Sequence, residues 1–156
     1  MHRLGARRLG GAALNLELAA VTLAPGHAGG APLLLEEPLS FWGGLDPTTG
    51  RIIDRWHPQA GAEVAGRVLM MPAGRGSSSG SATLAEAIRL GVGPAAILLL
   101  KRDAIVIVGA LVAAEIYRLP CPVALVAAED WARLAAAGRL EVRAEVDSTA
   151  ILVYQA

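Results

Sequence analysis

The sequence predicts a single α/β domain with a partly parallel sheet, and three observations lead to this fold class. Short apolar runs alternate with segments of helical periodicity through the middle of the chain, which is typical of parallel β-α-β units. Segments near both ends alternate between apolar and polar residues, which predicts further strands on one side of that sheet. No linker or internal repeat divides the 156 residues, a length typical of one domain.

The N-terminal region is predicted to contain a loose arm and two extended segments. Residues 1–12 are basic and contain glycine, so we expect a loose arm there and a single domain over 13–156. Alternating leucines from Leu14 onward predict a strand, which Pro25 and the glycines after it should break. Residues 32–40 are expected to form a second extended segment.

A turn-rich stretch follows over residues 41–50, and residues 51–54 are short and β-branched. Three of the few aromatic residues flank this region: Phe41, Trp42 and Trp56. Because aromatic side chains mostly serve packing, we expect them to plug one end of a β core.

The rest of the chain predicts alternating strands and helices. Three apolar runs are typical of buried strands: 66–71, 95–100 and 123–127. Two segments have helical periodicity and a glycine after them: 83–90 and 129–137. Two final strands are expected over 140–146 and 151–154. Residues 104–119 begin with β-branched side chains and continue with helix formers, so we expect short β character that runs into a helix ended by Pro120.

The composition excludes several classes of protein. Apolar residues make up 54% of the chain and charged residues 18%, and 14 cationic residues balance 14 anionic ones. This composition argues against disorder and against the basic field that nucleic acid requires. Its low charge fits either a surface covered by a partner or an alanine-rich domain that is simply apolar.

Neither a membrane span nor a secretion signal is predicted. The longest apolar run, over 104–114, is too short to cross a bilayer. A signal peptide would need an apolar stretch where Asn15 and Glu17 stand. We therefore expect a cytoplasmic protein that binds neither membrane nor nucleic acid.

Metal binding by this chain is not expected. It has one cysteine, Cys121, and three histidines, His2, His27 and His57, none of them at metal-ligand spacing. Because Cys121 is the only cysteine, a disulfide within the chain is excluded.

The loop over residues 74–81 carries the main functional signal. It stands between a predicted strand and a predicted helix, where ligands bind in open α/β sheets. Its glycines allow close approach of the backbone, helix N–H groups favour anions, and Arg75 suits a carboxylate or phosphate. An ordinary helix cap in a flexible Gly-Ser linker is the alternative. Neither the Walker pattern nor the nucleophile elbow is present.

At this loop the sequence resembles the small subunit, or swivel domain, of the aconitase X family. The run GRVLMMPAGRGSSSGS over 66–81 has the strongest similarity, and PLSFWGGLDP over 38–47, extended to Asp54 and His57, is similar as well. PAAI over 94–97 and the Gly-Ala pair at 109–110 follow in the same order. The resemblance covers about residues 33–127.

This resemblance implies a swivelling β/β/α three-layer domain that belongs to a hydro-lyase. The chain is then expected to be the small subunit of a heteromeric enzyme, active only with a large catalytic subunit. The cysteines of that large subunit bind iron or an iron–sulfur cluster, while the small chain itself binds no cofactor. The substrate expected from the resemblance is cis-3-hydroxy-L-proline. The alternatives are mevalonate 5-phosphate and a non-enzymatic module that binds a small anion or docks on a partner. A phosphorylated substrate would need more positive charge around the cleft. Lys101 and Arg102, near the end of a strand, are candidates for it, although a solvated surface pair is the favoured interpretation of these two residues.

The resemblance also assigns roles to individual residues. Ser77 takes the position of the family's catalytic base. The substrate carboxylate is expected on Arg75 and the loop N–H groups, with Gly76 and Ser78 beside it. We expect Asp46 and His57 near the mouth of the cleft, with a structural role favoured for His57.

The other two serines of the loop, Ser79 and Ser81, lie closer to the helix and are expected to cap it.

Overall fold

The structure, a computed structural model, describes residues 8–9 and 12–155. Its strands, in chain order, are β1 (Arg8–Leu9), β2 (Ala12–Ala24), β3 (Gly26–Gly30), β4 (Pro32–Leu34), β5 (Leu45–Asp46), β6 (Arg51–Ile52), β7 (Val68–Met71), β8 (Ala96–Leu99), β9 (Val123–Leu125), β10 (Arg139–Ala144) and β11 (Thr149–Tyr154). Its helices are α1 (Phe41–Gly44), α2 (Gly80–Arg89), α3 (Ala104–Tyr117) and α4 (Trp131–Ala135), with a 3-10 turn η1 (Ala128–Asp130).

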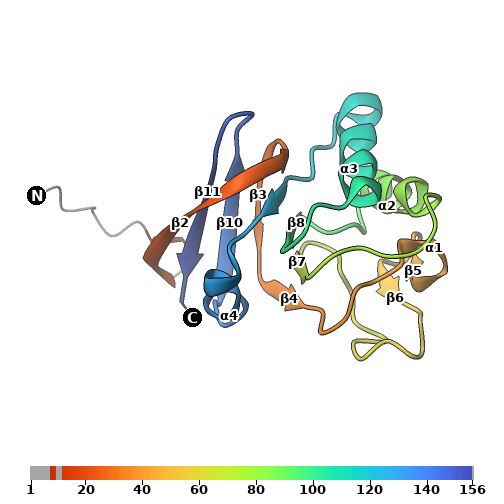
Figure 1. The fold of residues 1–156 in the computed structure, drawn as a ribbon, viewed down its shortest axis with the longest axis horizontal. Helices are drawn as coiled ribbons and strands as arrows, with labels where there is room; N and C mark the ends of the chain where they lie inside the picture. Colours follow the sequence, from red (N-terminus) through yellow and green to blue (C-terminus); the bar gives the residue numbers. More distant parts are fainter. Residues whose placement is uncertain (1–7, 10–11, 156) are drawn as a thin grey trace, which may run out of the picture.

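These elements form three layers. Strands β4, β7, β8 and β9 are parallel neighbours, and β9 continues through β2, β11 and β10 to β3 in antiparallel pairs. Figure 1 shows α2 and α3 on one side of β7 and β8, and β2, β10 and β11 on the other. The predicted α/β class with a partly parallel sheet and a β/β/α arrangement is therefore confirmed.

The central strands are buried on both faces. Leu69 and Met71 of β7 belong to the core under the helices, whereas Val68 and Met70 belong to the core between the two groups of strands. The sequence of a strand that is covered on both sides is a continuous apolar run, without alternating polar residues. For this reason β7 and β8 could be recognised in the sequence.

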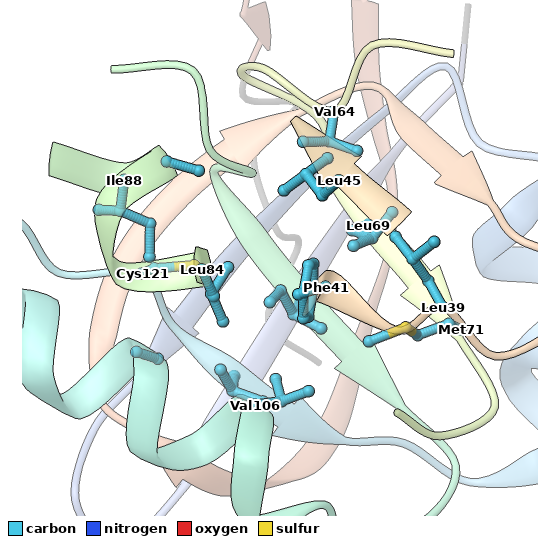
Figure 2. Packing of buried hydrophobic residues seen from close by; sticks show 14 of the residues in the cluster. Leu39, Phe41, Leu45, Val64, Leu69, Met71, Leu84, Ile88, Val106 and Cys121 are labelled. Carbon is cyan, nitrogen blue, oxygen red and sulfur yellow. The ribbon is translucent and has the colours of Figure 1, made fainter. Parts of the chain in front are cut away.

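Phe41 anchors the core beneath the helices. Its side chain is buried, and Figure 2 shows it in the middle of a cluster that includes Leu69, Leu84 and Val106. The other two aromatic residues do not plug the core as expected, because Trp42 and Trp56 are both exposed. Only Phe41 has the packing role that the sequence suggested for all three.

The expected break at Pro25 is confirmed, because β2 ends at Ala24, but the glycines after it form a further strand that was not expected, β3 (Gly26–Gly30), which pairs along β10. Gly30 is required by packing: a Cβ at this position would collide with the carbonyl oxygen of Gly66. Close approach of two backbones is one of the reasons for glycine inside a strand. The sequence alone does not show which backbone will lie opposite.

The β character expected at the start of 104–119 is also wrong, because α3 is helical from Ala104. The carboxylate of Asp103 accepts a hydrogen bond from the N–H of Val106 at 3.0 Å and caps the helix. Val106 is fully buried, and such packing overrides the modest preference of valine and isoleucine for strands. As expected, α3 ends before Pro120.

Most other expected elements are confirmed: α2, α4, β2 and β7 to β11. The extended segment expected over 32–40 is a strand only as far as Leu34. The arm expected over 1–12 is not loose at Arg8 and Leu9, which form β1 and pair with the start of β2. The rest of that arm before Ala12 lies outside the described residues.

Candidate functional site

The chain segments that follow three parallel strands meet at one edge of the sheet. Beyond β4 and β7, Leu39 pairs with Gly74 in a parallel bridge. Beyond β8, the carboxylate of Asp103 lies against Gly74, and its atoms are 2.8–2.9 Å from the position that a Cβ on Gly74 would take. Ser40 contacts Gly76 in the same region. This is the carboxyl edge at which open α/β sheets bind ligands.

The loop over 74–79 leads directly into α2. The carbonyl oxygen of Ser77 accepts a hydrogen bond from the N–H of Gly80 at 2.9 Å, and that of Ser78 accepts one from Ser81 at 3.2 Å. The side-chain Oγ of Ser77 accepts a further hydrogen bond from the N–H of Ser79 at 3.2 Å. Ser77 is thus held at the N-terminus of α2 by both its carbonyl and its hydroxyl oxygen.

The outer side of this loop is open to a ligand. Residues 75–79 are all exposed. Among the described residues, none accepts a hydrogen bond from the backbone N–H groups of Gly76, Ser77 and Ser78. Three free donors beside a helix N-terminus form a site that favours an anion.

The expected capping roles of Ser79 and Ser81 are not present. Ser79 stands at the N-cap position, but its side chain makes no capping hydrogen bond. The hydroxyl of Ser81 instead donates to the carbonyl oxygen of Ile105 at 2.7 Å. It therefore ties the first turn of α2 to the first turn of α3.

Arg75 reaches across to another loop. Its guanidinium lies 3.5 Å from Oδ2 of Asp54, and the exposed fraction of its side chain is 46%. The other oxygen of that carboxylate accepts a hydrogen bond from the N–H of Trp56 at 3.0 Å. The Asp54 side chain is the less exposed partner, at 25%.

The structure does not bring Asp46 to this loop. Its carboxylate accepts hydrogen bonds from the N–H and the hydroxyl of Thr48, and these hydrogen bonds lower the pKa of Asp46. The carbonyl oxygen of Asp46 accepts the N–H of Gly50, which packs against Val92. Since Val92 follows the C-terminal end of α2, this turn lies at the opposite end of the helix from Ser77.

His57 lies in the core of its own loop. The side chain is buried, Nε2 donates to the carbonyl oxygen of Glu37 at 3.0 Å, and Nδ1 accepts the N–H of Gln59 at 3.0 Å. This assignment of the ring proton satisfies both nitrogens. The arrangement suits a residue that joins two loops.

Within the described part of the chain, no three histidine, cysteine, aspartate or glutamate side chains are grouped to hold a metal ion. Cys121 is fully buried, and burial raises the pKa of its thiol to about 12. A thiolate, which is the form that binds metal, is therefore disfavoured there. No helix within the described residues has the length and apolar character needed to cross a membrane.

Asp54 lies between Asp46 and His57, which were expected near the mouth of the cleft, but its contact with Arg75 was not predicted, and Ser40 and Asp103 were not singled out as parts of this region. Each comes from a loop other than 74–81, so spacing along the chain does not connect them. For Asp103 a usable signal was a polar residue soon after the apolar strand β8, because the carboxyl ends of parallel strands share one edge.

Fold and loop together define a β/β/α swivel-type domain that presents a Gly-Ser loop at the carboxyl edge of its parallel strands. Comparison with known families agrees with this description, because the model of the aconitase X swivel domain matches residues 17–152. The chain belongs to the aconitase X swivel domain family.

Similar proteins occur both as long chains and as small subunits. The chain is 47% identical over 128 residues to a protein of Pseudomonas aeruginosa named cis-3-hydroxy-L-proline dehydratase, a match that covers 78% of this chain and 22% of that protein. It is 40% identical over 98 residues to a phosphomevalonate dehydratase small subunit of Methanothermobacter thermautotrophicus, covering 63% of this chain and 75% of that one. The chain thus spans about a fifth of the hydroxyproline dehydratase.

A solved structure has the same fold. The crystal structure of Thermococcus kodakaraensis aconitase X in its holo form superposes with a TM-score of 0.73 at 27% sequence identity. The match covers 89% of this chain and 98% of the other.

Proposed function

We propose that this chain is the swivel domain of a dehydratase that removes water from a small hydroxy acid. Its similarity to proteins named dehydratases supports the reaction type. The candidate loop is exposed along 75–79, so the remaining walls of an active site must come from outside the described residues. We assign those walls to a large catalytic part, joined covalently or as a separate subunit.

Ser77 is the proposed catalytic base, and one observation carries this assignment. Its Oγ is exposed and at the same time accepts the N–H of Ser79 at the N-terminus of α2. A serine hydroxyl is a weak base, and it becomes effective only when donors stabilise the negative charge of its alkoxide. The Ser79 N–H is such a donor, and Ser78 has no comparable contact.

The substrate carboxylate is proposed to bind beside Ser77. The free N–H groups of Gly76, Ser77 and Ser78 supply donors, and Arg75 supplies a positive charge with a forked geometry. A carboxylate held there brings the carbon next to it close to the Ser77 hydroxyl. Binding of this kind contributes to the rate by orienting the reacting groups.

The proposed reaction is an elimination. Ser77 accepts the proton from the carbon adjacent to the carboxylate, and the electron pair of that C–H bond forms a C=C bond. The C–O bond at the neighbouring carbon breaks and its electron pair leaves with the hydroxyl group. The Ser77 hydroxyl returns the abstracted proton to this group, which departs as water, and the Ser77 base is regenerated. Proton abstraction by a positioned base contributes on the order of 10²–10⁴-fold.

The described residues do not fit iron or an iron–sulfur cluster. Cys121 is a buried thiol, and no group of potential ligands gathers in the described part of the chain. We therefore assign any such metal centre to the large catalytic part.

The proposed substrate is cis-3-hydroxy-L-proline, because the similarity to the hydroxyproline dehydratase is 47% against 40% for the phosphomevalonate dehydratase small subunit. Mevalonate 5-phosphate is the second candidate. One observation favours it: Lys101 and Arg102 are exposed directly after β8, at the same edge of the sheet.

Assay of the assembled enzyme tests the proposed function and separates the two substrates. The chain alone should release no product from cis-3-hydroxy-L-proline, whereas the chain combined with its large part should turn it over. A kcat/KM at least tenfold higher for mevalonate 5-phosphate would select the second substrate. Turnover by this chain alone, or none of either substrate by the assembly, would contradict the proposal.

A further inference from the structure

We infer that Asp54 is a positioning residue that holds the Arg75 guanidinium at the place where the substrate carboxylate binds. The inference rests on the proposed function and adds a residue to it. The juxtaposition is a contact of 3.5 Å between Oδ2 of Asp54 and the guanidinium of Arg75, two residues that belong to different loops.

Asp54 is itself held firmly. Its N–H donates to the carbonyl oxygen of Gly44, which is buried, and its carbonyl oxygen accepts the N–H of His57. One carboxylate oxygen accepts the N–H of Trp56 at 3.0 Å, so the orientation of the carboxylate is set. The second oxygen therefore presents a fixed negative charge to Arg75.

The loop of 54–57 is in turn anchored to the body of the domain. His57 is buried and donates through Nε2 to the carbonyl oxygen of Glu37. The N–H of Ile53, just before Asp54, donates to the carbonyl oxygen of Gly44 at 2.8 Å. Asp54 is thus a rigid support rather than a mobile surface carboxylate.

Arg75, by contrast, needs a support. The two residues that follow it, Gly76 and Ser77, are exposed, and an arginine side chain has several rotatable bonds whose ordering is entropically unfavourable. Among the described residues, only Asp54 accepts a hydrogen bond from its guanidinium. The remaining donors of the fork stay available for a second carboxylate, which is the class of ligand proposed here.

A contribution to folding alone explains this pair poorly. Surface ion pairs contribute little to stability, and the Arg75–Asp54 contact, at 3.5 Å, is long. The chain offers a matched pair in Arg51 and Glu63, which lie 2.5 Å apart, are more exposed and bridge the two ends of the segment that contains Asp54. Neutralising Glu63 therefore controls for the loss of a surface carboxylate.

The experiment is a double-mutant cycle in the assembled enzyme with cis-3-hydroxy-L-proline, using Asp54→Asn, Arg75→Gln, the double variant and Glu63→Gln. Asparagine keeps an oxygen for the Trp56 N–H, so the loop should fold. Asp54→Ser, whose hydroxyl can accept the same N–H, is the second variant. Thermal unfolding identifies the variants that are folded, and the cycle is read from those.

We expect Asp54→Asn to raise KM about three- to fivefold, the effect of losing an interaction of about 1 kcal/mol, with kcat within about twofold. In the Arg75→Gln background the same substitution should change KM no further, and Glu63→Gln should leave both constants unchanged.

Three results would overturn the inference. An unchanged KM in Asp54→Asn, or an equal rise in both backgrounds, would show that Asp54 does not act through Arg75 while the proposed function stands. An unchanged KM in Arg75→Gln would remove the proposed role of Arg75 itself, and this inference with it.

Discussion

Gly76 lies so close to Ser40 that a Cβ on Gly76 would collide with the Ser40 side chain, and its φ of +92° is in the region that favours glycine. Gly76→Ala should therefore strain the backbone and push the loop away from Ser40. Gly61 is a matched control, since its φ is +88° but nothing lies within 4 Å of its Cβ position. We expect urea unfolding to show a loss of about 1 kcal/mol for Gly61→Ala, the effect of φ alone, and a clearly larger loss for Gly76→Ala.

Equal losses in these two variants would contradict the close packing of the loop against Ser40. The variant Gly76→Ala with Ser40→Gly separates the two effects, because it removes the collision and leaves the backbone strain. Its unfolding free energy should return toward that of Gly61→Ala.

Ser81 and Ser79 should differ in their contribution to stability. The Ser81 hydroxyl joins α2 to α3 through the carbonyl oxygen of Ile105, in a partly buried position. Removing it in Ser81→Ala should lower the unfolding free energy by about 1 kcal/mol. Ser79→Ala removes an exposed side chain that caps nothing, so the change should stay within about 0.5 kcal/mol. Urea unfolding of both variants, with the reverse order of losses as the contrary result, tests this difference.

His57 should matter for folding and not for the proton transfers of the reaction. His57→Ala empties a buried position and leaves the carbonyl oxygen of Glu37 and the N–H of Gln59, both in partly buried hydrogen bonds, without their partner, a loss of about 2 kcal/mol. His27→Ala is the control, because His27 forms an exposed pair with Glu145 and should change stability by less than about 1 kcal/mol. Stability is measured by thermal unfolding and kcat in the assembled enzyme. A kcat reduced a hundredfold in folded His57→Ala would instead make His57 part of the proton transfer.

Cys121 should remain protonated in the folded chain well above the pH at which a free thiol ionises. Burial raises the pKa of its thiol from 9.0 to about 12. The folded state holds this proton more tightly than the unfolded state, so the thiol's contribution to stability is complete below pH 9 and is lost as pH rises toward 12. A thiol reagent at pH 8 should react slowly with the native chain and rapidly in urea. Rapid reaction of the native chain would contradict the burial.

The pH dependence of stability gives a second measurement of the same group. Unfolding free energies of the native sequence and of Cys121→Ala, compared between pH 8 and 11, isolate the contribution of the thiol. The difference between the two should narrow as pH rises.

Apolar runs made the parallel part of the fold predictable from sequence. Val68 to Met71 is buried on both faces, and burial of this kind leaves a continuous apolar run that any reader of the sequence can find. The strand β3 was not predictable, because one of its glycines, Gly30, is explained only by a neighbouring backbone, that of Gly66. Helix α3 was missed in part for a similar reason, since the buried environment of Val106 outweighs its strand propensity.

The candidate site was predictable only where it is local in sequence. The loop around Ser77 combines glycine, arginine and serine in one short stretch, and the sequence therefore shows it directly. Asp54 and Ser40 reach the same edge through separate loops, so their proximity to Arg75 and Gly76 depends on the fold. The contact between the Ser79 N–H and the Ser77 hydroxyl was likewise hidden, because serine beside a helix start is most simply interpreted as a cap.

The most direct test of the account is the steady-state kcat of Ser77→Ala beside that of Ser79→Ala in the assembled enzyme. Loss of the base should lower kcat and kcat/KM together by on the order of 10²–10⁴-fold, with assembly intact, while Ser79→Ala stays within about twofold of the native enzyme. The contrary result is a Ser77→Ala enzyme that keeps more than about a tenth of the native kcat, because this loss is smaller than the smallest effect expected of a general base. It would contradict the central claim and assign the base to the large catalytic part.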